Sequence, residues 1–245
     1  MKLIIFAFIA LLTLTNCAEK NRTFSTSEIA ILPKPISLDL HKASFAFKAD
    51  QTIFSNLDEQ QIAAQDLQNY INKTASFNLN IDKNNNSSIV NKKKEGLNAQ
   101  SYELSVTPKK ITIYANDVAG YFYGVQTVKQ LMAIETSKDT RHTKYLVPSV
   151  TIKDGPRFKW RAFMLDEARY FHGEVFVKQM LDQMALLKMN TFHWHLIDDA
   201  GWRIEIKKYP LLTKVGAFRA DSEIGTWKSG KTSGQPHGGF YTQEQ

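Results

Sequence analysis

Residues 160–197 read WRAFMLDEARYFHGEVFVKQMLDQMALLKMNTFHWHLI, and this stretch decides the fold. Residues 160–165 are apolar on both faces apart from Arg161, which is typical of a buried strand in a parallel sheet. Residues 174–188 repeat apolar side chains at helical spacing. That apolar side comprises Phe176, Val177, Met180, Leu181, Met184 and Leu187. Because residues 191–197 form a second strand-like run, the sequence predicts one βαβ unit of a parallel sheet or barrel.

Polar side chains follow both predicted strands. Arg169 lies in the loop that begins at Asp166, and Asp198 directly follows the second strand. Adjacent parallel strands end at one rim, where barrels and open sheets hold their sites. An arginine there can donate a planar fork of hydrogen bonds to vicinal sugar hydroxyls, and an aspartate can orient a histidine or a carboxylic acid. Equally, Arg169 and Asp198 can pair with each other or with Asp166 as structural ions. No glycine-rich loop joins strand to helix, which argues against a nucleotide-binding fold.

Two histidines of the second strand share a face. His193 and His195 are two residues apart, so their imidazoles point the same way. Asp198 and Asp199 follow closely and could complete the ligand set of a divalent metal. Alternatively, both are buried histidines bonded to nearby carboxylates. The residues alone leave both interpretations open.

A separate module precedes this unit, and the turn signal at residues 154–156 divides the two. Weak or clear alternation predicts strands, and helical spacing predicts helices. The predicted strands are 44–47, 77–81, 102–106 and 111–115, the predicted helices are 58–71 and 118–134, and the Asn-rich and Lys-rich residues 82–94 are predicted as a loop. Strands with helices on one face make a small α+β domain over residues 29–153. Nothing in that module looks catalytic.

The N-terminus predicts export. Lys2 precedes an apolar run over residues 3–12, which has the length of a signal-peptide core and is too short to span a bilayer. Cys17, the only cysteine, follows this run and resembles the lipidated cysteine of bacterial lipoproteins. We expect residues 1–17 to be a signal peptide, residues 18–28 a polar tether, and the mature protein to be periplasmic or on the cell surface. An ordinary signal peptide with an incidental cysteine remains the alternative.

Composition and charge indicate an ordinary folded protein and bear on one class of partner, nucleic acids. The chain has 245 residues, 43% of them hydrophobic and 22% charged, as in ordinary folded domains. The formal net charge is +7, partly from lysine runs such as residues 92–94. Basic residues are not interleaved with aromatic residues on one element, so we expect a solvated basic surface and no nucleic-acid partner.

The last four residues have the pattern of a helix start. Thr242, with a glutamine three residues later at Gln245, matches the S/T-x-x-E/Q capping box. The pattern predicts a helix that begins where the sequence ends, and hence an incomplete barrel.

Three segments together resemble one family. They are residues 154–161 (DGPRFKWR), 165–169 (LDEAR) and 189–203 (MNTFHWHLIDDAGWR). In this order they resemble the opening of the catalytic barrel of glycoside hydrolase family 20, the β-N-acetylhexosaminidases. Residues 123–131 (YGVQTVKQL) similarly resemble the small N-terminal α+β domain of that family. The resemblance implies an α+β N-terminal domain over 29–153, followed over 154–245 by the start of a truncated (β/α)8 TIM barrel.

The resemblance also implies roles for single residues. Arg169 matches the arginine that grips the hydroxyls of the terminal N-acetylhexosamine, and Asp198 matches the aspartate that supports a later histidine beside the catalytic acid. His193, His195 and Asp199 match motif positions that are architectural in the family. Asp166 is expected to support the site with them. One departure is Tyr170, where the family usually has histidine, and it bears on fine specificity.

Members of the family are exo-acting hydrolases of glycans that carry terminal N-acetylhexosamine, and they need no metal or other cofactor. The acetamido oxygen of the substrate attacks the anomeric carbon, an aspartate steadies the resulting ring, and the adjacent glutamate acts as general acid and then base. That pair lies on a later strand of the barrel. The sequence holds Asp-Glu only at residues 58–59 and 166–167, neither in the expected place, so we expect this chain to be inactive by itself. A metal-dependent barrel hydrolase using His193 and His195, and a non-catalytic carbohydrate-binding remnant, are the alternatives.

Overall fold

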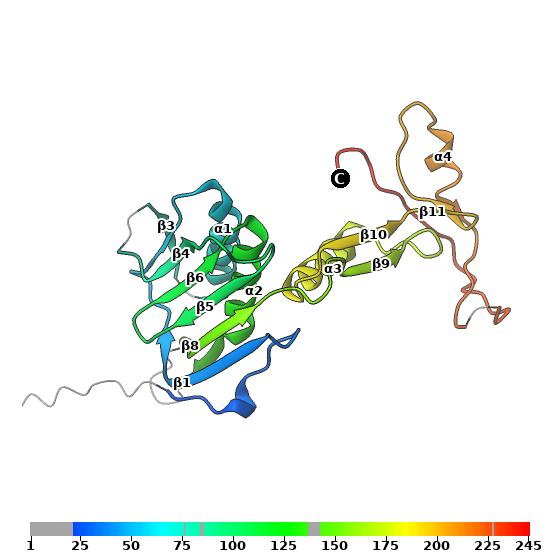
Figure 1. The fold of residues 1–245 in the computed structure, drawn as a ribbon. Helices are drawn as coiled ribbons and strands as arrows, with labels where there is room; N and C mark the ends of the chain where they lie inside the picture. Colours follow the sequence, from blue (N-terminus) through cyan, green and yellow to red (C-terminus); the bar gives the residue numbers. More distant parts are fainter. Residues whose placement is uncertain (1–21, 76, 84–85, 137–142, 227) are drawn as a thin grey trace, which may run out of the picture.

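The computed structural model describes residues 22–245 apart from 76, 84–85, 137–142 and 227. A sheet module comes first, and an arm that carries the βαβ unit extends from it (Figure 1). None of the helices in this described part has both the length and the apolar character of a membrane-spanning segment. The predicted signal peptide and Cys17 lie outside the described residues.

The sheet of the first module is mixed. Within the described residues it has eight strands in the order β1-β8-β5-β6-β4-β2-β3, and β7 pairs with β8. The strands are β1 (Ser37–Ala46), β2 (Thr52–Phe54), β3 (Asn80–Asp82), β4 (Ile89–Lys93), β5 (Tyr102–Val106), β6 (Ile111–Ala115), β7 (Ala133–Thr136) and β8 (Thr143–Asp154). Strands β2, β3, β4 and β6 pair in parallel, and the other pairs are antiparallel.

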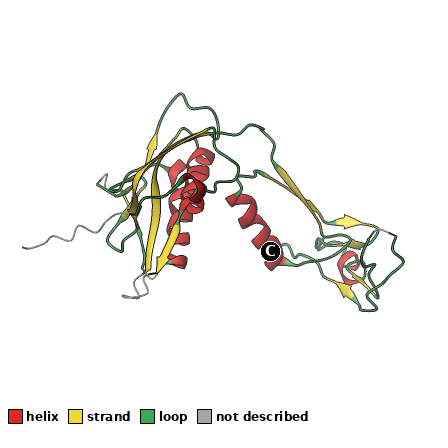
Figure 2. Cartoon of the chain, turned by 90° about the horizontal axis from the view of Figure 1, so that it is seen from below, coloured by secondary structure: helices red, strands yellow, loops and turns green. Residues whose placement is uncertain are grey.

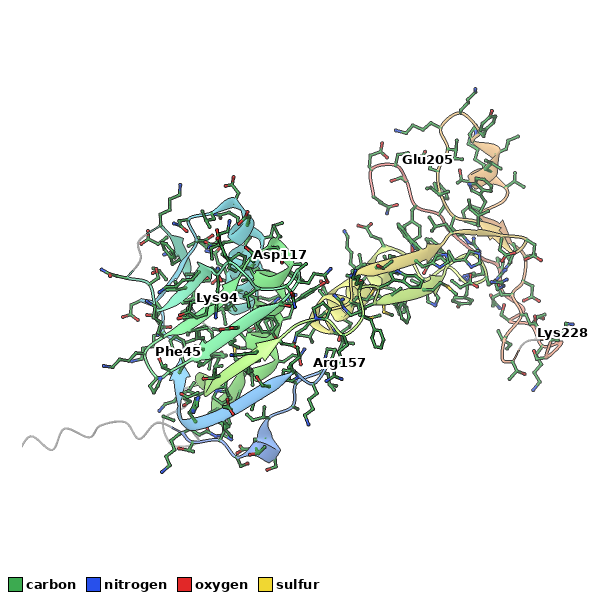
Figure 3. All side chains as sticks on the ribbon, viewed as in Figure 1. Phe45, Lys94, Asp117, Arg157, Glu205 and Lys228 are labelled. Atoms are coloured by element: carbon green, nitrogen blue, oxygen red, sulfur yellow. The ribbon has the colours of Figure 1, made fainter. Side chains whose placement is uncertain are left out.

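Helices α1 (Asp58–Thr74) and α2 (Val118–Leu131) cover one face of this sheet (Figure 2). The side chain of Asp117 caps α2 by accepting a backbone hydrogen bond of 2.7 Å (Figure 3). Gly124 allows close packing, because a Cβ there would lie 2.5 Å from Cγ2 of Ile113. The main hydrophobic core of the chain lies between these helices and the sheet.

Several predicted elements of this module are confirmed. Strands β5 and β6 have the predicted bounds, and α1 begins at the predicted residue and runs three residues further than expected, to Thr74 rather than 71. The weak strand predicted at 44–47 is the end of the longer β1. The strand predicted at 77–81 is found at Asn80–Asp82, as β3.

Two expectations are wrong. Strand β4 lies within the predicted loop 82–94, because Ile89, Val90 and Asn91 are buried between β2 and β6. The helix expected over 118–134 ends at Leu131, since the next residues form β7 against β8. Within the described part of the predicted tether, Phe24 is buried and Thr26–Glu28 form a 3-10 turn.

The arm contains the predicted βαβ unit. Strands β9 (Ala162–Asp166) and β10 (Thr191–His195) pair in parallel, and α3 (Glu174–Leu186) connects them. The expected burial is incomplete, because β10 is the one strand beside β9 in the described residues. Phe163 and Met164 are therefore exposed, while Val177 and Met184 on α3 are buried.

Short elements follow β10. They are β11 (Ile197–Asp198), β12 (Gly201–Trp202), α4 (Leu211–Lys214), β13 (Phe218–Arg219) and β14 (His237–Gly238). The predicted capping box forms both of its hydrogen bonds: the Thr242 amide donates to Gln245 Oε1 at 2.9 Å, and the Gln245 amide donates to Thr242 Oγ1 at 3.3 Å. Residues 242–245 themselves are not helical.

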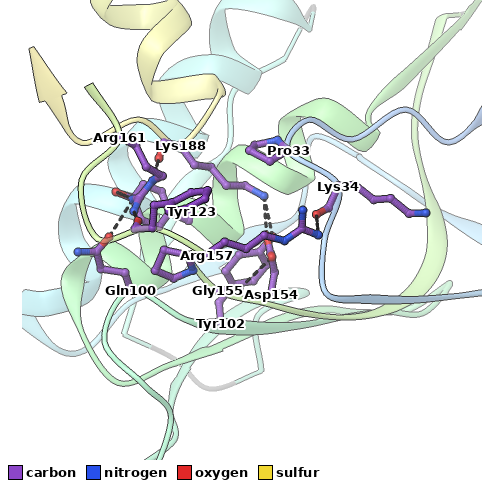
Figure 4. A pocket seen from close by; sticks show the side chains of 12 residues that line it. Pro33, Lys34, Gln100, Tyr102, Tyr123, Asp154, Gly155, Arg157, Arg161 and Lys188 are labelled. Atoms are coloured by element: carbon purple, nitrogen blue, oxygen red, sulfur yellow. Dashed lines mark hydrogen bonds and ion pairs between the residues drawn. The ribbon is translucent and has the colours of Figure 1, made fainter. Parts of the chain in front are cut away.

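A buried polar network joins the arm to the first module (Figure 4). The ammonium of Lys188 lies 2.9 Å from both the Tyr102 hydroxyl and Oδ2 of Asp154. Arg161 donates to the Lys188 carbonyl at 2.7 Å and to the Tyr123 hydroxyl at 2.9 Å. Burial lowers the pKa of Lys188, and the Asp154 carboxylate opposes this effect. The network holds the turn between α3 and β10 against the end of β8.

Candidate active site

The carboxyl ends of β9 and β10 form the rim that the sequence predicts. The parallel register places Asp166 opposite His195. The backbone then continues the pairing, because the amides of Glu167 and Ala168 both donate to the His195 carbonyl, at 3.0 and 3.1 Å. The loop that begins at Asp166 is thus fixed over the end of β10.

Arg169 bridges two carboxylates at this rim. Its Nη1 lies 2.5 Å from Asp166 Oδ2, and its Nη2 lies 2.7 Å from Asp198 Oδ2. The His195 ring completes the cluster, with Nδ1 3.6 Å from Asp166 and Nε2 3.5 Å from Asp198. The structure therefore brings Arg169, Asp166, Asp198 and His195 together, and the ion pairing considered from the sequence is present. The side chain of Arg169 is still 47% exposed, so the guanidinium remains accessible to a ligand.

The charges of this cluster support one another. Partial burial acts to raise the pKa of Asp166, but hydrogen bonds from the side chain and amide of Arg169 outweigh it and hold that pKa below its usual range. The pKa of Asp198 is also lowered, first by the hydrogen bond from the Asp199 amide and then by the charge of Arg169. Both carboxylates are therefore anionic at neutral pH, and Arg169 is held by charge as well as by geometry.

The remaining predicted site residues lie at the edge of the cluster. His193 shares a face with His195, and their ring centroids are 6.3 Å apart, but its side chain is exposed. The amide of Asp199 donates a hydrogen bond to the Asp198 carboxylate, and Asp199 lines the neighbouring cavity. Among the residues that the structure describes, no group of three or more His, Cys, Asp or Glu side chains is arranged to hold a metal ion. The metal hypothesis thus finds no ligand set at His193 and His195.

Glu167 has a burial and a set of partners that the sequence did not predict. It is fully buried, and its carboxylate accepts hydrogen bonds from the amide and the Nδ1 of His172, both at 2.9 Å, and from the Tyr241 hydroxyl at 2.8 Å. Burial, and then the hydrogen bond to Glu167, raise the pKa of Tyr241, so its hydroxyl remains a donor. A buried glutamate usually has partners, but the partner at Tyr241 is 74 residues away, and no local pattern points to it.

Arg203 ties the surrounding loops together. Its buried guanidinium donates to the carbonyls of Glu167 and Ala168, both at 3.0 Å, and to those of Ala217 and Gly239. Its role is structural, because all of these partners are backbone carbonyls of the loops around the rim.

A cavity of about 390 Å³ opens beside Arg169. It is lined by Arg169, Asp199, Ala200, Arg219, Glu223, Gly225 and Thr226. Arg219 forms its wall and donates to Ser222 Oγ at 2.9 Å, to the Ala200 carbonyl at 3.2 Å and to the Arg169 carbonyl. Guanidinium and carboxylate groups around one cavity are well suited to hydroxyl groups of a sugar.

A second cavity of about 260 Å³ lies at the junction of the arm and the first module (Figure 4). Its polar groups, Lys188, Asp154 and Arg161, already bond to one another or to neighbouring residues. We therefore assign it to the packing of the two parts, and place the candidate site at the rim, where Arg169 is accessible.

A parallel βαβ unit with charged groups at the carboxyl rim is the arrangement found in α/β enzymes, barrels and open sheets alike, that act at that rim. Comparison with known proteins identifies the family. The profile of glycosyl hydrolase family 20, domain 2, matches residues 28–155, and that of the family 20 catalytic domain matches residues 158–245. The chain belongs to glycosyl hydrolase family 20. Its fold is the α/β domain 2 of that family followed by the start of the catalytic domain.

Individual proteins of this family also match most of the chain. A beta-hexosaminidase of Vibrio furnissii is 37% identical over 217 residues, which are 89% of this chain and 34% of that protein. A beta-hexosaminidase of Porphyromonas gingivalis is 35% identical and covers 96% of this chain and 30% of that protein. The crystal structure of a family 20 exo β-N-acetylglucosaminidase from Vibrio harveyi, in complex with N-acetylglucosamine, superposes with a TM-score of 0.76 at 33% identity, over 91% of this chain and 34% of that one. The chain spans about a third of the length of these relatives.

Proposed function

We propose that this chain supplies sugar-binding residues of an exo-acting β-N-acetylhexosaminidase, which removes terminal N-acetylhexosamine from glycans. The observation that carries the proposal is the bridge of Arg169 between Asp166 and Asp198 at the rim. The two carboxylates hold the guanidinium in place, and Arg169 also lines the 390 Å³ cavity. A sugar ring in this cavity would receive fork-like hydrogen bonds from Arg169 to its vicinal hydroxyls.

The proposed mechanism is substrate-assisted retention. The acetamido oxygen of the bound sugar attacks the anomeric carbon while a glutamic acid protonates the leaving oxygen, and the same residue then activates water. The neighbouring aspartate steadies the acetamido group. In this scheme Asp198 supports the group next to the catalytic acid, as in the family resemblance.

The Asp-Glu pair of this chain at residues 166–167 does not fit that task. Asp166 is paired with Arg169, and Glu167 is buried among His172 and Tyr241. We therefore propose that the 245-residue chain binds the sugar but leaves a chromogenic N-acetyl-β-glucosaminide intact. Robust turnover by the purified chain would show that the acid lies within it.

Binding of matched disaccharides tests the proposed substrate class. Chitobiose ends in N-acetylglucosamine, whereas N-acetyllactosamine ends in galactose. We expect chitobiose to bind weakly, with a Kd of about 1 mM or about −4 kcal/mol, and N-acetyllactosamine to bind at least tenfold more weakly. Equal binding of the two, measured by NMR titration of the rim amides, would reject exo-acting recognition of N-acetylhexosamine.

We further propose that the protein is exported and anchored through a lipid on Cys17, which becomes the mature N-terminus once residues 1–16 are removed. The apolar run before the lone cysteine supports this proposal. Cells that produce the wild-type chain should incorporate radiolabelled palmitate into it, and cells that produce Cys17→Ser should not. A soluble, unlabelled wild-type protein in the medium would contradict the anchor.

A further inference from the structure

Besides His195 and Arg203, a segment further along the chain also holds the loop that carries Arg169. This loop runs from Asp166 to His172, and the segment runs from Arg219 to Tyr241. Three hydrogen bonds connect them. The Tyr241 hydroxyl donates to Glu167 at 2.8 Å, the Phe171 amide donates to Nε2 of His237 at 3.0 Å, and Arg219 donates to the Arg169 carbonyl.

These contacts fix the chain both before and after Arg169 in the sequence. Glu167 lies two residues before it and is fixed by Tyr241, and Phe171 lies two residues after it and is fixed by His237. The pairing of β13 with β14 places Arg219 opposite His237, so two of the three contacts come from one small antiparallel pair. Tyr241 is itself held by the backbone, because its amide donates to the Arg203 carbonyl at 2.8 Å.

Ring stacking strengthens the same connection. The Tyr170 ring stacks on the His237 ring at a centroid distance of 4.0 Å, and the Phe171 ring lies 5.0 Å from the Tyr241 ring. Trp194 of β10 also packs on Tyr241, with ring centroids 4.4 Å apart. A buried tyrosine in this position therefore links the loop, strand β10 and the distal segment.

We propose that Tyr241 and His237 are positioning residues for Arg169, which hold its loop in the geometry that binds the sugar. The inference rests on the proposed function, since the sugar grip of Arg169 is part of it. Neither residue needs to touch the sugar. Each acts by removing freedom from the loop before binding, because a guanidinium that is already oriented loses less entropy when the ligand arrives.

Two pairs of variants test the proposal in the full 245-residue chain. Tyr241→Phe removes the hydroxyl that reaches Glu167, and Tyr145→Phe is its matched control. Tyr145 is also buried, and its hydroxyl donates to the Thr74 carbonyl at 3.1 Å in the first module, far from the loop. His237→Leu removes the acceptor for the Phe171 amide, whereas His237→Gln can present a carbonyl oxygen in its place.

The readouts are the Arg169 Nε–Hε signal in NMR spectra and the affinity for N-acetylglucosamine. We expect Tyr241→Phe and His237→Leu to shift and broaden the Arg169 signal and to weaken N-acetylglucosamine binding by about three- to tenfold, the scale of one hydrogen bond. Tyr145→Phe should change neither readout, and His237→Gln should restore binding to within about twofold of the wild type.

An Arg169 signal in Tyr241→Phe that matches that of Tyr145→Phe would overturn the proposal, as would equal effects of His237→Leu and His237→Gln. The NMR readout needs no ligand. If the wild-type chain fails to bind N-acetylglucosamine, the proposed function fails, while the Arg169 signal still decides whether Tyr241 and His237 position the loop.

Discussion

At the scale of single residues, the rim uses the same charges for structure and for the proposed binding. Arg169 links the ends of β9 and β10, because it pairs with Asp166 at the end of β9 and with Asp198 shortly after β10. Exposed ion pairs of this kind contribute little to stability. Their value here is orientation, since two carboxylates hold the planar guanidinium while 47% of the Arg169 side chain stays exposed.

The pH dependence of stability reports on one residue of this region. Burial, and then the positive charges of Arg219 and Arg203, lower the pKa of His237 below its ordinary value of 6.5. As pH falls below 6.5, the unfolded chain binds a proton that the folded chain does not, so this residue makes stability decrease toward acid. The full contribution is present above pH 6.5 and is lost as pH falls through the folded pKa.

Urea unfolding of the wild type and His237→Gln between about pH 5 and pH 7.5 measures this contribution. The wild type should lose more stability than the variant over this range, because glutamine does not titrate. The other titrating groups are common to both proteins and cancel in the difference. Parallel pH profiles of the two proteins would show that His237 titrates alike in the folded and unfolded chains.

Sequence reasoning located the residues that short-range geometry determines. Arg169, Asp166, Asp198 and His195 follow from two strands in parallel register, and they meet as that register requires. It did not predict the burial of Glu167, because this burial depends on Tyr241, whose place is set by loops far along the chain.

At the scale of elements, periodicity worked where two kinds of side chain, apolar and more polar, alternate along a strand. Strands β5 and β6 alternate in this way and were predicted with their bounds. Strand β4 is different, because its apolar residues are adjacent and its flanks are rich in Asn and Lys. Strand β4 is buried because it pairs with β2 along one edge and with β6 along the other, and no local sequence pattern records these neighbours.

The junction between β8 and the turn after α3 gives a stability prediction. Lys188 and Asp154 are nearly buried, with 7% and 11% of their side chains exposed. Lys188→Met would leave the Asp154 carboxylate without its cation, and we expect a loss of about 3 kcal/mol in the free energy of unfolding. Replacing both members, in Lys188→Met with Asp154→Leu, should recover most of this loss, because no buried charge remains.

The matched control is Lys178→Met, which breaks the solvent-exposed pair with Glu174 on α3. That change should alter the free energy of unfolding by less than about 0.5 kcal/mol. Denaturant unfolding monitored by circular dichroism compares the three variants. Similar effects of Lys188→Met and Lys178→Met would mean that the junction does not hold the arm.

At the scale of the whole molecule, the two parts differ in how well they bury their apolar residues. The first module has an extensive core between its sheet and its helices, whereas the arm buries a small cluster around Leu165, Val177 and Tyr241. Phe163, Met164 and Leu181 of the arm remain exposed. A barrel closes its apolar faces only when its strands surround them, and the described arm has two parallel strands.

We therefore expect residues 23–155 to unfold cooperatively when produced alone. Residues 157–245 alone should show no cooperative transition, because their core is too small to offset the loss of chain entropy. Thermal unfolding followed by circular dichroism and by tyrosine and tryptophan fluorescence measures both. A sharp transition in residues 157–245 would contradict this account of the barrel.

The central claim is that the rim built around Arg169 binds a terminal N-acetylhexosamine. NMR titration of the 245-residue chain with N-acetylglucosamine tests it most directly, with Arg169→Lys beside Arg157→Lys. Arg157 lies at the junction, where its guanidinium reaches the Lys34 carbonyl at 3.5 Å (Figure 3). Lysine keeps the charge of Arg169 but loses its fork, so binding should weaken about tenfold or more in Arg169→Lys and remain unchanged in Arg157→Lys. Equal affinity of Arg169→Lys and the wild type would contradict the claim.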